Sequence, residues 1–242
     1  GKTTTLYAAL SEINRVESKI VTIEDPVEYR LRGINQIQIN EKAGLTFARG
    51  LRSILRHDPD VVLVGEIRDE ETARIAVQAS LTGHLVFSTL HTNDAPGALT
   101  RLVDMGIEPY LVASSADTIL AQRLVRVLCP LCRVPDESAA SARLLEEWGV
   151  AGNGCIYRAV GCEHCRQTGY SGRRAIVEMM AVGAEVRQLL LDRQATGAIR
   201  QAALRHGMRS LRDDGLRLVR EGVTSLDEVL RVTTAGESAE EG

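Results

Sequence analysis

The first hundred residues alternate between short apolar runs and longer stretches in which apolar residues recur with helical spacing. The apolar runs, which predict buried strands, lie near residues 20–24, 61–65 and 85–90. The helical patterns lie near residues 3–15, 46–56, 70–82 and 94–104. Strands that alternate with helices in this way predict a parallel sheet with crossover helices. A partly alternating pattern at 34–39 predicts a peripheral strand or hairpin.

The second half of the chain has longer polar stretches and a different pattern. Residues 117–126 are amphipathic and predict a helix, and residues 136–149 begin like a capped helix that stops at Gly149. Residues 184–232 carry apolar stripes with helical spacing, which predict helices packed on a core rather than a cofactor-binding segment. The tail 235–242 is small and acidic, and we expect it to be disordered.

Composition and charge exclude some classes of protein. With 242 residues and 44% hydrophobic content, the chain is long enough for one large domain and a smaller appendage. The net charge is only −3 and 3% of the residues are aromatic, so nucleic-acid binding is disfavoured. No apolar run approaches the roughly 18 residues of a membrane span. We therefore expect a cytoplasmic protein with no direct membrane span and no nucleic-acid partner.

Two segments far apart in the sequence point to nucleotide binding. Gly1-Lys2-Thr3-Thr4 reads like the end of a phosphate-binding loop, in which the lysine neutralises phosphate charge and the hydroxyl of Thr3 is a Mg²⁺ ligand. Alone, this segment is more simply read as an ordinary helix start. The apolar run 61–64 ends in Gly65-Glu66, as a buried strand that presents a carboxylate for Mg²⁺ or water would. Together they favour a nucleotide site, and we expect the chain to begin inside that site, as part of a longer protein.

Further polar side chains follow the other two predicted strands. Glu24, Asp25 and Glu28 cluster after the first strand, where a solvated acidic loop is the simpler alternative and catalysis of hydrolysis is favoured. His84 and His91 flank the strand near 85–90. A shared metal site for them is rejected because seven strand residues span about 20 Å or more. We expect His91 to sense the γ-phosphate, with His84 at the opposite end of the strand.

The cysteines form two Cys-x-x-Cys pairs, Cys129 with Cys132 and Cys162 with Cys165. Each pair can supply two thiolates to a tetrahedral Zn²⁺. Disulfides are the alternative, but zinc is favoured in a chain without a secretion signal. Cys155 is left over and is interpreted as a free or buried thiol. His164 lies inside the second pair and is a competing ligand, although the four cysteines are sufficient.

Four motifs together resemble the secretion ATPase superfamily of type II secretion and type IV pilus motors. They are Thr-Ile-Glu-Asp-Pro-Val-Glu at 22–28, Leu-Arg-His-Asp-Pro-Asp at 55–60, Val-Gly-Glu-Ile-Arg-Asp at 64–69 and Gly-His-Leu-Val-Phe-Ser-Thr-Leu-His-Thr-Asn at 83–93. With Gly1-Lys2-Thr3 they match the Walker A, Asp box, Walker B and His box of that superfamily. The sequences of residues 78–82, 101–109 and 121–126 are most similar to those of the type II secretion ATPases, general secretory pathway protein E. The type IV pilus assembly ATPases are the alternative. The resemblance runs from residue 1 to about residue 233.

The resemblance implies an α/β fold. We expect a RecA-like P-loop NTPase core with a mostly parallel sheet, a small tetracysteine zinc module and a C-terminal helical region. The corresponding segments are 1–125, 126–172 and 173–233, with a disordered tail at 234–242. A strand within 168–178 is expected to return to the core.

The resemblance also implies roles for the candidate site residues. Gly1, Lys2, Thr3 and Thr4 would bind ATP, Thr3 and Glu66 would hold Mg²⁺, and Glu28 would be the general base. Glu24 and Asp25 would support the site, His91 would face the nucleotide, and His84 is the other histidine of its box. The four paired cysteines would bind zinc.

The family resemblance further implies a homo-hexameric motor at the inner membrane. Such a ring would act with the inner-membrane secretion platform and its cytoplasmic-domain anchor proteins, and would drive pseudopilus assembly and export. We expect the chain by itself to be inactive. The alternative from another functional class is a zinc-stabilised scaffold that does not hydrolyse ATP.

Overall fold

The computed structural model describes residues 1–148 and 155–234, which form two compact units. Unit 1 comprises Gly1–Ile119 and Met180–His206, and unit 2 comprises Leu120–Met179 and Gly207–Gly242. Each unit is thus made of two separate chain segments. The linear division into 1–125, 126–172 and 173–233 stays a prediction about domains, and the expected disorder at 235–242 lies outside the described residues.

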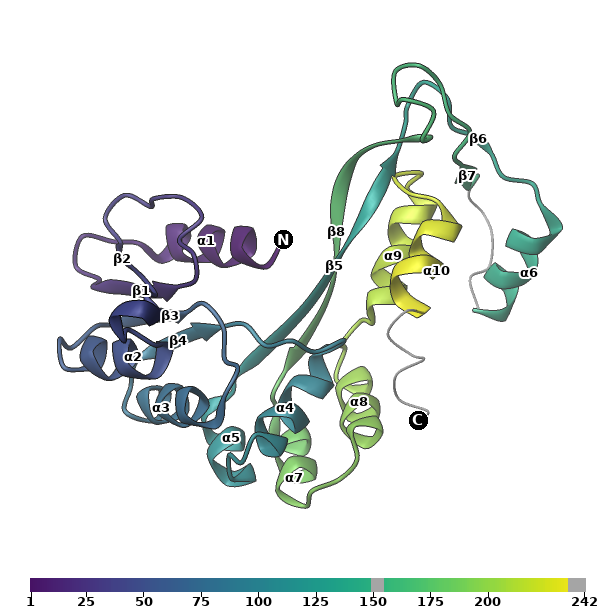
Figure 1. Ribbon diagram of the computed structural model, residues 1–242. Coiled ribbons are helices and arrows are strands. Elements are labelled where there is room, and N and C mark those ends of the chain that lie inside the picture. Colours follow the sequence, from purple (N-terminus) through teal and green to yellow (C-terminus); the bar gives the residue numbers. More distant parts are fainter. Residues whose placement is uncertain (149–154, 235–242) are drawn as a thin grey trace. The chain divides into compact units, whose positions relative to one another are not determined.

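Unit 1 contains a four-stranded parallel sheet with the strand order β2-β1-β3-β4 (Figure 1). The strands are β1 (Ile20–Glu24), β2 (Asn35–Gln38), β3 (Val61–Val64) and β4 (Leu85–Ser88). The two central strands, β1 and β3, are buried at every position, as their continuous apolar runs predict. The edge strand β4 is exposed or half-buried throughout. The three predicted strands and the peripheral strand are confirmed, the last as an edge strand parallel to β1.

Helices cover both faces of this sheet. Helix α1 (Lys2–Ile13) packs Tyr7 and Leu10 against Ile20 and Leu63 on one face. Helices α2 (Phe47–Leu55) and α3 (Glu70–Leu81) pack on each other and lie on the opposite face (Figure 1). The approach of α2 is close: a Cβ on its Gly50 would lie 2.1 Å from a methyl carbon of Ile23.

The remaining helices of unit 1 include two that come from late in the sequence. They are α4 (Ala95–Asp104), α5 (Pro109–Ser115), α7 (Ala184–Leu191) and α8 (Thr196–Arg205), with a short 3-10 turn η1 (Glu41–Ala43). Helix α4 packs on α8, and α5 packs on α7. The helices predicted near 3–15, 46–56, 70–82 and 94–104 and within 184–232 are confirmed. Helix α5 was not predicted, although Pro109 occupies its first turn, a position where proline is favoured.

The helix predicted at 117–126 is wrong, because this segment is a strand. It forms β5 (Thr118–Leu128), which pairs with β8 (Tyr170–Ala181) in a two-stranded ribbon. Val182 N donates to Asp117 O and Cys129 N to Gly169 O, so the two strands run antiparallel. Along β5, Val125 is buried and its neighbours Leu124 and Arg126 are exposed, which is strand periodicity. Pairing with a segment about fifty residues away in sequence decided the conformation, and local amphipathicity did not.

Unit 2 combines most of this ribbon with helices and small loops. Its other elements are β6 (Val134–Pro135), α6 (Ala139–Glu147), β7 (Tyr157–Arg158), α9 (Leu211–Arg220) and α10 (Leu226–Thr233). The predicted helix at 136–149 is confirmed as α6, with Ser138 as its N-cap, although Gly149 lies outside the described residues. The strand expected within 168–178 is confirmed as β8.

A buried carboxylate joins the ribbon of unit 2 to its C-terminal helix. Glu228 of α10 is 1% exposed and accepts hydrogen bonds from Arg126 of β5 and from Arg231. Arg126 also lies over the ring of Tyr170, 4.0 Å from its centroid. A buried charge is stable only when it is paired in this way. The fold as a whole confirms the expected α/β class, with its parallel sheet, four-cysteine cluster and C-terminal helices.

Candidate functional site

The candidate nucleotide site lies at the carboxyl edge of the parallel sheet of unit 1. Because β1, β3 and β4 are parallel, Glu24, Gly65-Glu66 and the segment 89–93 leave the sheet at the same edge. Gly65 N donates to Ile23 O, and a Cβ on Gly65 would lie 3.2 Å from the Cα of Glu24, so a larger residue would crowd this crossing. Thr89 Oγ1 donates to Gly65 O at 2.8 Å. These bonds hold the ends of the three strands together.

Glu66 and His91 meet at this edge, as their positions at strand ends predict. His91 Nε2 donates to one carboxylate oxygen of Glu66 at 3.0 Å, and Arg68 donates to the other at 2.5 Å. Burial by itself raises the pKa of Glu66, but the hydrogen bonds from Arg68 and His91 outweigh it and hold that pKa below its ordinary value. Glu66 is therefore an anion at neutral pH, which suits a ligand of Mg²⁺.

The N-terminus of α1 points toward the same edge. Tyr7 contacts Glu24 at the carboxyl end of β1. Asn14, just after the helix, donates to the carbonyl oxygen of Arg32 at 2.8 Å, and Arg32 precedes β2, at the amino edge of the sheet. Lys2 lies five residues before Tyr7, about 7.5 Å farther along the axis, and therefore beyond the strand ends. The N-cap residue Gly1 provides no side-chain cap, so the first N–H groups of α1 are open to an anion. This arrangement fits the phosphate-binding roles expected of Gly1, Lys2, Thr3 and Thr4.

The carboxylate that ends β1 and the two that follow it have different environments. Glu24 is 3% exposed, and its oxygens accept hydrogen bonds from Tyr7, from Thr22 and from Gln36. Asp25 and Glu28 are exposed. Asp25 lies close enough to Arg68 to raise the pKa of that guanidinium, after the larger effect of Glu66. Glu24 is thus a buried anchor, whereas Asp25 and Glu28 are accessible to solvent.

His84 lies away from this group of residues. It precedes β4, and its Nδ1 is 2.7 Å from the carbonyl oxygen of Pro59, which precedes β3. Both positions are at the amino edge of the sheet, the opposite end from Glu66 and His91. The placement at the opposite end agrees with the expectation from strand length, and a nucleotide-binding role for His84 remains only a prediction.

Arg68 is the residue of this site that sequence reasoning missed. It lies in the Val-Gly-Glu-Ile-Arg-Asp segment at 64–69, but only its contact with Glu66 shows that it belongs to the site. Its position two residues after a strand-end carboxylate was the one available signal.

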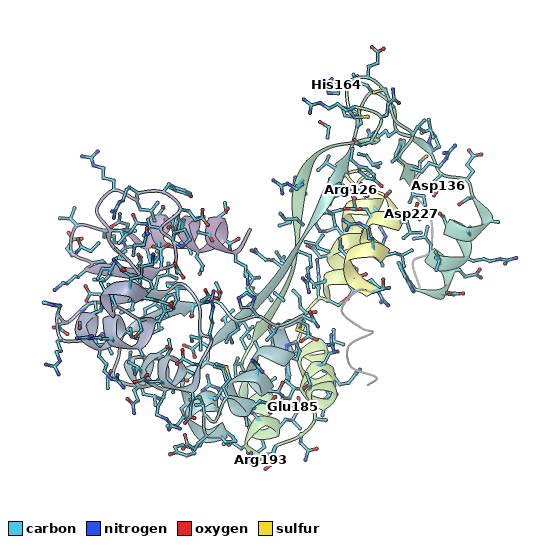
Figure 2. All side chains as sticks on the ribbon, in the orientation of Figure 1. Arg126, Asp136, His164, Glu185, Arg193 and Asp227 are labelled. Carbon is cyan, nitrogen blue, oxygen red and sulfur yellow. The ribbon has the colours of Figure 1, made fainter. Side chains whose placement is uncertain are left out.

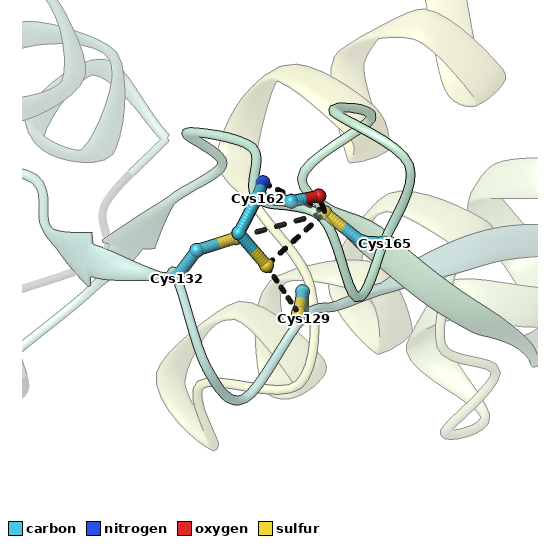
Figure 3. Close-up of side chains that lie close together, drawn as sticks. All are labelled: Cys129, Cys132, Cys162 and Cys165. Atoms are coloured by element: carbon cyan, nitrogen blue, oxygen red, sulfur yellow. Dashed lines mark hydrogen bonds between the residues drawn. The ribbon is translucent and has the colours of Figure 1, made fainter.

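A second candidate site, in unit 2, consists of the four paired cysteines (Figure 3). The Sγ atoms of Cys129 and Cys162 are 3.9 Å apart, and those of Cys132 and Cys165 are 3.8 Å apart. A disulfide needs a separation of about 2.05 Å, and all four cysteines are free. A tetrahedral site with Zn–S bonds of about 2.3 Å has S···S edges of about 3.8 Å. The cluster therefore fits a tetrahedral thiolate metal site better than a pair of disulfides.

The thiols of this cluster differ in acidity: burial raises the pKa of Cys132 to about 11, whereas backbone N–H groups favour the thiolate of Cys165. Burial by itself raises the pKa of the Cys165 thiol, but donation to its Sγ from the N–H groups of Cys162 and Gly169, at 3.2 and 3.1 Å, lowers that pKa to about 6. A thiolate is the form that binds a metal. Cys155 is exposed and outside the cluster, as expected of the leftover cysteine. His164 is exposed at the second pair (Figure 2) and is not among the clustered groups.

Comparison with known proteins finds, over nearly the whole chain, the family that the sequence motifs resemble. The family model described as "Type II/IV secretion system protein" matches residues 1–231. "Type II secretion system protein E" of Aeromonas hydrophila is 56% identical over 233 residues, and "Type II secretion system ATPase E" of Vibrio cholerae is 54% identical. Both alignments cover 96% of this chain. "Type IV pilus assembly ATPase PilB" of Myxococcus xanthus is 51% identical over 95% of the chain.

A solved structure supports the fold. The pilus retraction motor PilT, with bound ADP, superimposes with a TM-score of 0.71 at 26% sequence identity, over 100% of this chain and 60% of that one. The chain spans about half the length of the curated relatives it matches, 46% for the two type II proteins and 41% for PilB.

Proposed function

The chain belongs to the type II/IV secretion system protein family, and on that premise we propose that it is the ATP-hydrolysing part of a type II secretion motor. The observation that carries the proposal is the meeting of Glu66 and His91 at the sheet edge toward which the N-terminus of α1 points. This edge combines a phosphate-binding helix end, a carboxylate for Mg²⁺ and exposed carboxylates, which are the parts that hydrolysis of ATP requires.

Each residue then has a chemical task. The N–H groups of the first turn of α1 and the ammonium of Lys2 bind the phosphates of ATP, and the hydroxyl of Thr3 and the carboxylate of Glu66 would hold Mg²⁺. A Mg²⁺ ion held there would supply positive charge to neutralise the transferred phosphoryl group. Glu28 accepts a proton from the attacking water, whose oxygen bonds to the γ-phosphorus while the bond to the bridging oxygen breaks. The products are ADP and phosphate. His91 faces the γ-phosphate, while Asp25 and Glu24 support the acidic loop.

We further propose that the cysteine cluster binds one Zn²⁺ with a structural role. Four protein thiolates fill a tetrahedral site and leave no open position for substrate. The distances between the sulfur atoms support this assignment, and the four-cysteine donor set favours zinc over a hard cation.

The proposal also includes the assembly in which the motor acts. We infer a homo-hexamer in the cytoplasm, peripheral at the inner membrane, that works with the secretion platform and its cytoplasmic-domain anchor proteins to assemble a pseudopilus and export proteins. Within the described residues no helix is long and apolar enough to cross a bilayer. By itself, the chain is expected to be inactive.

The test is Mg²⁺-dependent ATP hydrolysis by the complete protein that carries this chain, with Lys2→Ala as the variant. Loss of the ammonium at the phosphates is expected to abolish turnover. Lys19→Ala is the matched control, because Lys19 precedes β1 at the opposite edge of the sheet, where its backbone N–H donates to Asp60. Turnover that survives Lys2→Ala would contradict the proposed nucleotide site.

Type IV pilus assembly is the second candidate function, favoured by the 51% identity to PilB. Complementation separates the two systems. We expect the complete gene to restore protein export in a type II secretion mutant of a related bacterium and not to restore pili in a pilus assembly mutant. The reverse result would reassign the motor to pilus assembly with the same catalytic residues.

A further inference from the structure

The buried side chain of Tyr7 connects helix α1 to the acidic loop that carries Glu28. Tyr7 is 1% exposed, and its hydroxyl donates to a carboxylate oxygen of Glu24. The backbone of Glu28 lies close enough to the same hydroxyl to lower its pKa, against the larger effects of burial and of Glu24. The ring of Tyr7 packs edge-to-face on Tyr29, with centroids 4.7 Å apart and an interplanar angle of 78°. One side chain of α1 therefore contacts the end of β1 at Glu24, lies beside the backbone of Glu28 and packs on Tyr29.

Gln36 of β2 forms hydrogen bonds to the same loop. Its Oε1 accepts from the N–H of Leu31 at 2.7 Å, and its Nε2 donates to the carbonyl of Tyr29 at 3.1 Å. The same Nε2 lies 3.3 Å from both the hydroxyl of Tyr7 and Oε1 of Glu24. These contacts close a network of side chains from α1, β1 and β2 around the loop.

We propose that Tyr7 is a positioning residue for ATP hydrolysis: it fixes the loop that bears Glu28 relative to the helix end that bears Lys2 and Thr3. The inference rests on the proposed function of this site. A helix is stiff over five residues, so the place of Lys2 relative to Tyr7 is set by the geometry of α1. The hydrogen bonds of Tyr7 then set the place of the loop. Together they determine how far the base stands from the phosphates.

The state of the Tyr7 hydroxyl fits this role. Burial, followed by the neighbouring carboxylate of Glu24, raises the pKa of Tyr7 to about 12, so the hydroxyl remains protonated and donates to that carboxylate. A hydroxyl has one donor and two acceptor positions, which match Glu24 on one side and Glu28 with Gln36 on the other. Glu24, with both oxygens occupied, serves as an anchor and not as a contact for water.

The variant Tyr7→Phe separates positioning from packing. It keeps the ring, its contact with Tyr29 and its place in the core with Leu10, and removes only the hydroxyl. Thr22→Val is the matched control. It removes another buried donor to Glu24, but Thr22 lies within β1, and its hydroxyl donates to Glu24 and not to a residue of the loop at 25–31. Each variant removes one hydrogen-bond donor to the carboxylate of Glu24. Only Tyr7→Phe also removes the contacts through which the hydroxyl holds the loop in place.

In the complete protein, Tyr7→Phe is expected to lower kcat about tenfold or more while KM for ATP changes less than about twofold, because the base is misplaced and the phosphate contacts remain. Thr22→Val is expected to lower the melting temperature by about as much as Tyr7→Phe does, because each loses one donor to Glu24. Its kcat is expected to stay within about twofold of the wild-type value. Amide hydrogen exchange without nucleotide should become faster at 27–31 in Tyr7→Phe and stay unchanged there in Thr22→Val.

Two results would overturn the inference. One is wild-type kcat in Tyr7→Phe, and the other is an equal loss of kcat in both variants, which would show a purely structural role. A wild-type protein that does not hydrolyse ATP would contradict the proposed function instead. In that case hydrogen exchange still decides the inference, because unchanged exchange at 27–31 in Tyr7→Phe would show that the hydroxyl does not hold the loop.

Discussion

The two candidate sites of this protein are built in opposite ways. In unit 1, Lys2, Asp25, Glu28 and His91 are exposed and come from three separate segments: the start of α1, the loop after β1 and the segment after β4. In unit 2, all four ligand atoms lie within 4.8 Å of one another, and Cys129 and Cys165 are buried. An open edge lined by charged groups can admit a substrate. A closed thiolate cluster that binds a metal instead cross-links the chain segments that carry its cysteines. Changes in unit 1 should therefore alter turnover, and changes in unit 2 should alter stability.

The largest expected effect is loss of the metal from unit 2. The double variant Cys129→Ser, Cys162→Ser should release about one zinc per chain and unfold the loops around the cluster, since structural zinc contributes about 10–16 kcal/mol in small zinc domains. Metal analysis measures the zinc, and fluorescence of Trp148, the one tryptophan of the chain, reports on unit 2. Cys155→Ser is the control and should retain the metal, because Cys155 lies outside the cluster. Unchanged zinc in the double variant would contradict the site.

The next effect belongs to unit 1 alone. Glu28→Gln should lower ATP turnover by about 100-fold to 10,000-fold, because the amide cannot accept the proton of water. Nucleotide binding, measured by equilibrium titration, and zinc content should stay at wild-type values. Glu17→Gln is the control, an exposed carboxylate between α1 and β1. Normal turnover in Glu28→Gln would place the base elsewhere in the acidic loop.

Acid should weaken unit 2 through Glu228. Burial by itself raises the pKa of Glu228, but hydrogen bonds from Arg231 and Arg126 lower it to about 2 from 4.5. Because the folded pKa is lower than the unfolded one, the stabilisation is complete above about pH 4.5 and is lost as the pH falls toward 2. It amounts to at most about 3 kcal/mol, since both arginines are half-exposed to solvent.

The measurement is the melting temperature followed by Trp148 fluorescence between pH 6 and pH 2. Wild-type protein should lose stability over this range, and Glu228→Gln should start less stable and lose less of it. Equal pH dependence in the two proteins would assign the acid sensitivity to other carboxylates.

The smallest expected effect comes from a surface ion pair of unit 1. Arg52 of α2 and Glu71 of α3 are 2.6 Å apart, but their side chains are 56% and 59% exposed. Arg52→Ala should change the free energy of unfolding by less than about 0.5 kcal/mol, because solvent screens such pairs. Chemical denaturation followed by circular dichroism measures it. A loss above about 1 kcal/mol would show that this pair, and not apolar packing, joins α2 to α3.

Local patterns in the sequence predicted much of unit 1. The strands β1 and β3 are continuous apolar runs, and burial on both faces of a parallel sheet requires that composition. The polar residues that follow these runs were expected at one edge, and the contact between Glu66 and His91 agrees. The partners of Glu24 were not predicted, because Tyr7 and Gln36 reach it from other elements and no local periodicity encodes such contacts.

The sequence by itself determined the alternation of strands and helices, the cysteine pairs and the family, because these depend on residue types at short spacings. The tertiary structure decided three things: that 118–128 is a strand, that Glu24 is an anchor inside a network with Tyr7 and Gln36, and that Arg68 belongs to the site. The physical reason is common to all three. Each depends on partners distant along the chain or on a side-chain contact that only the folded backbone creates, and the free energy of such contacts is absent from any short stretch of sequence.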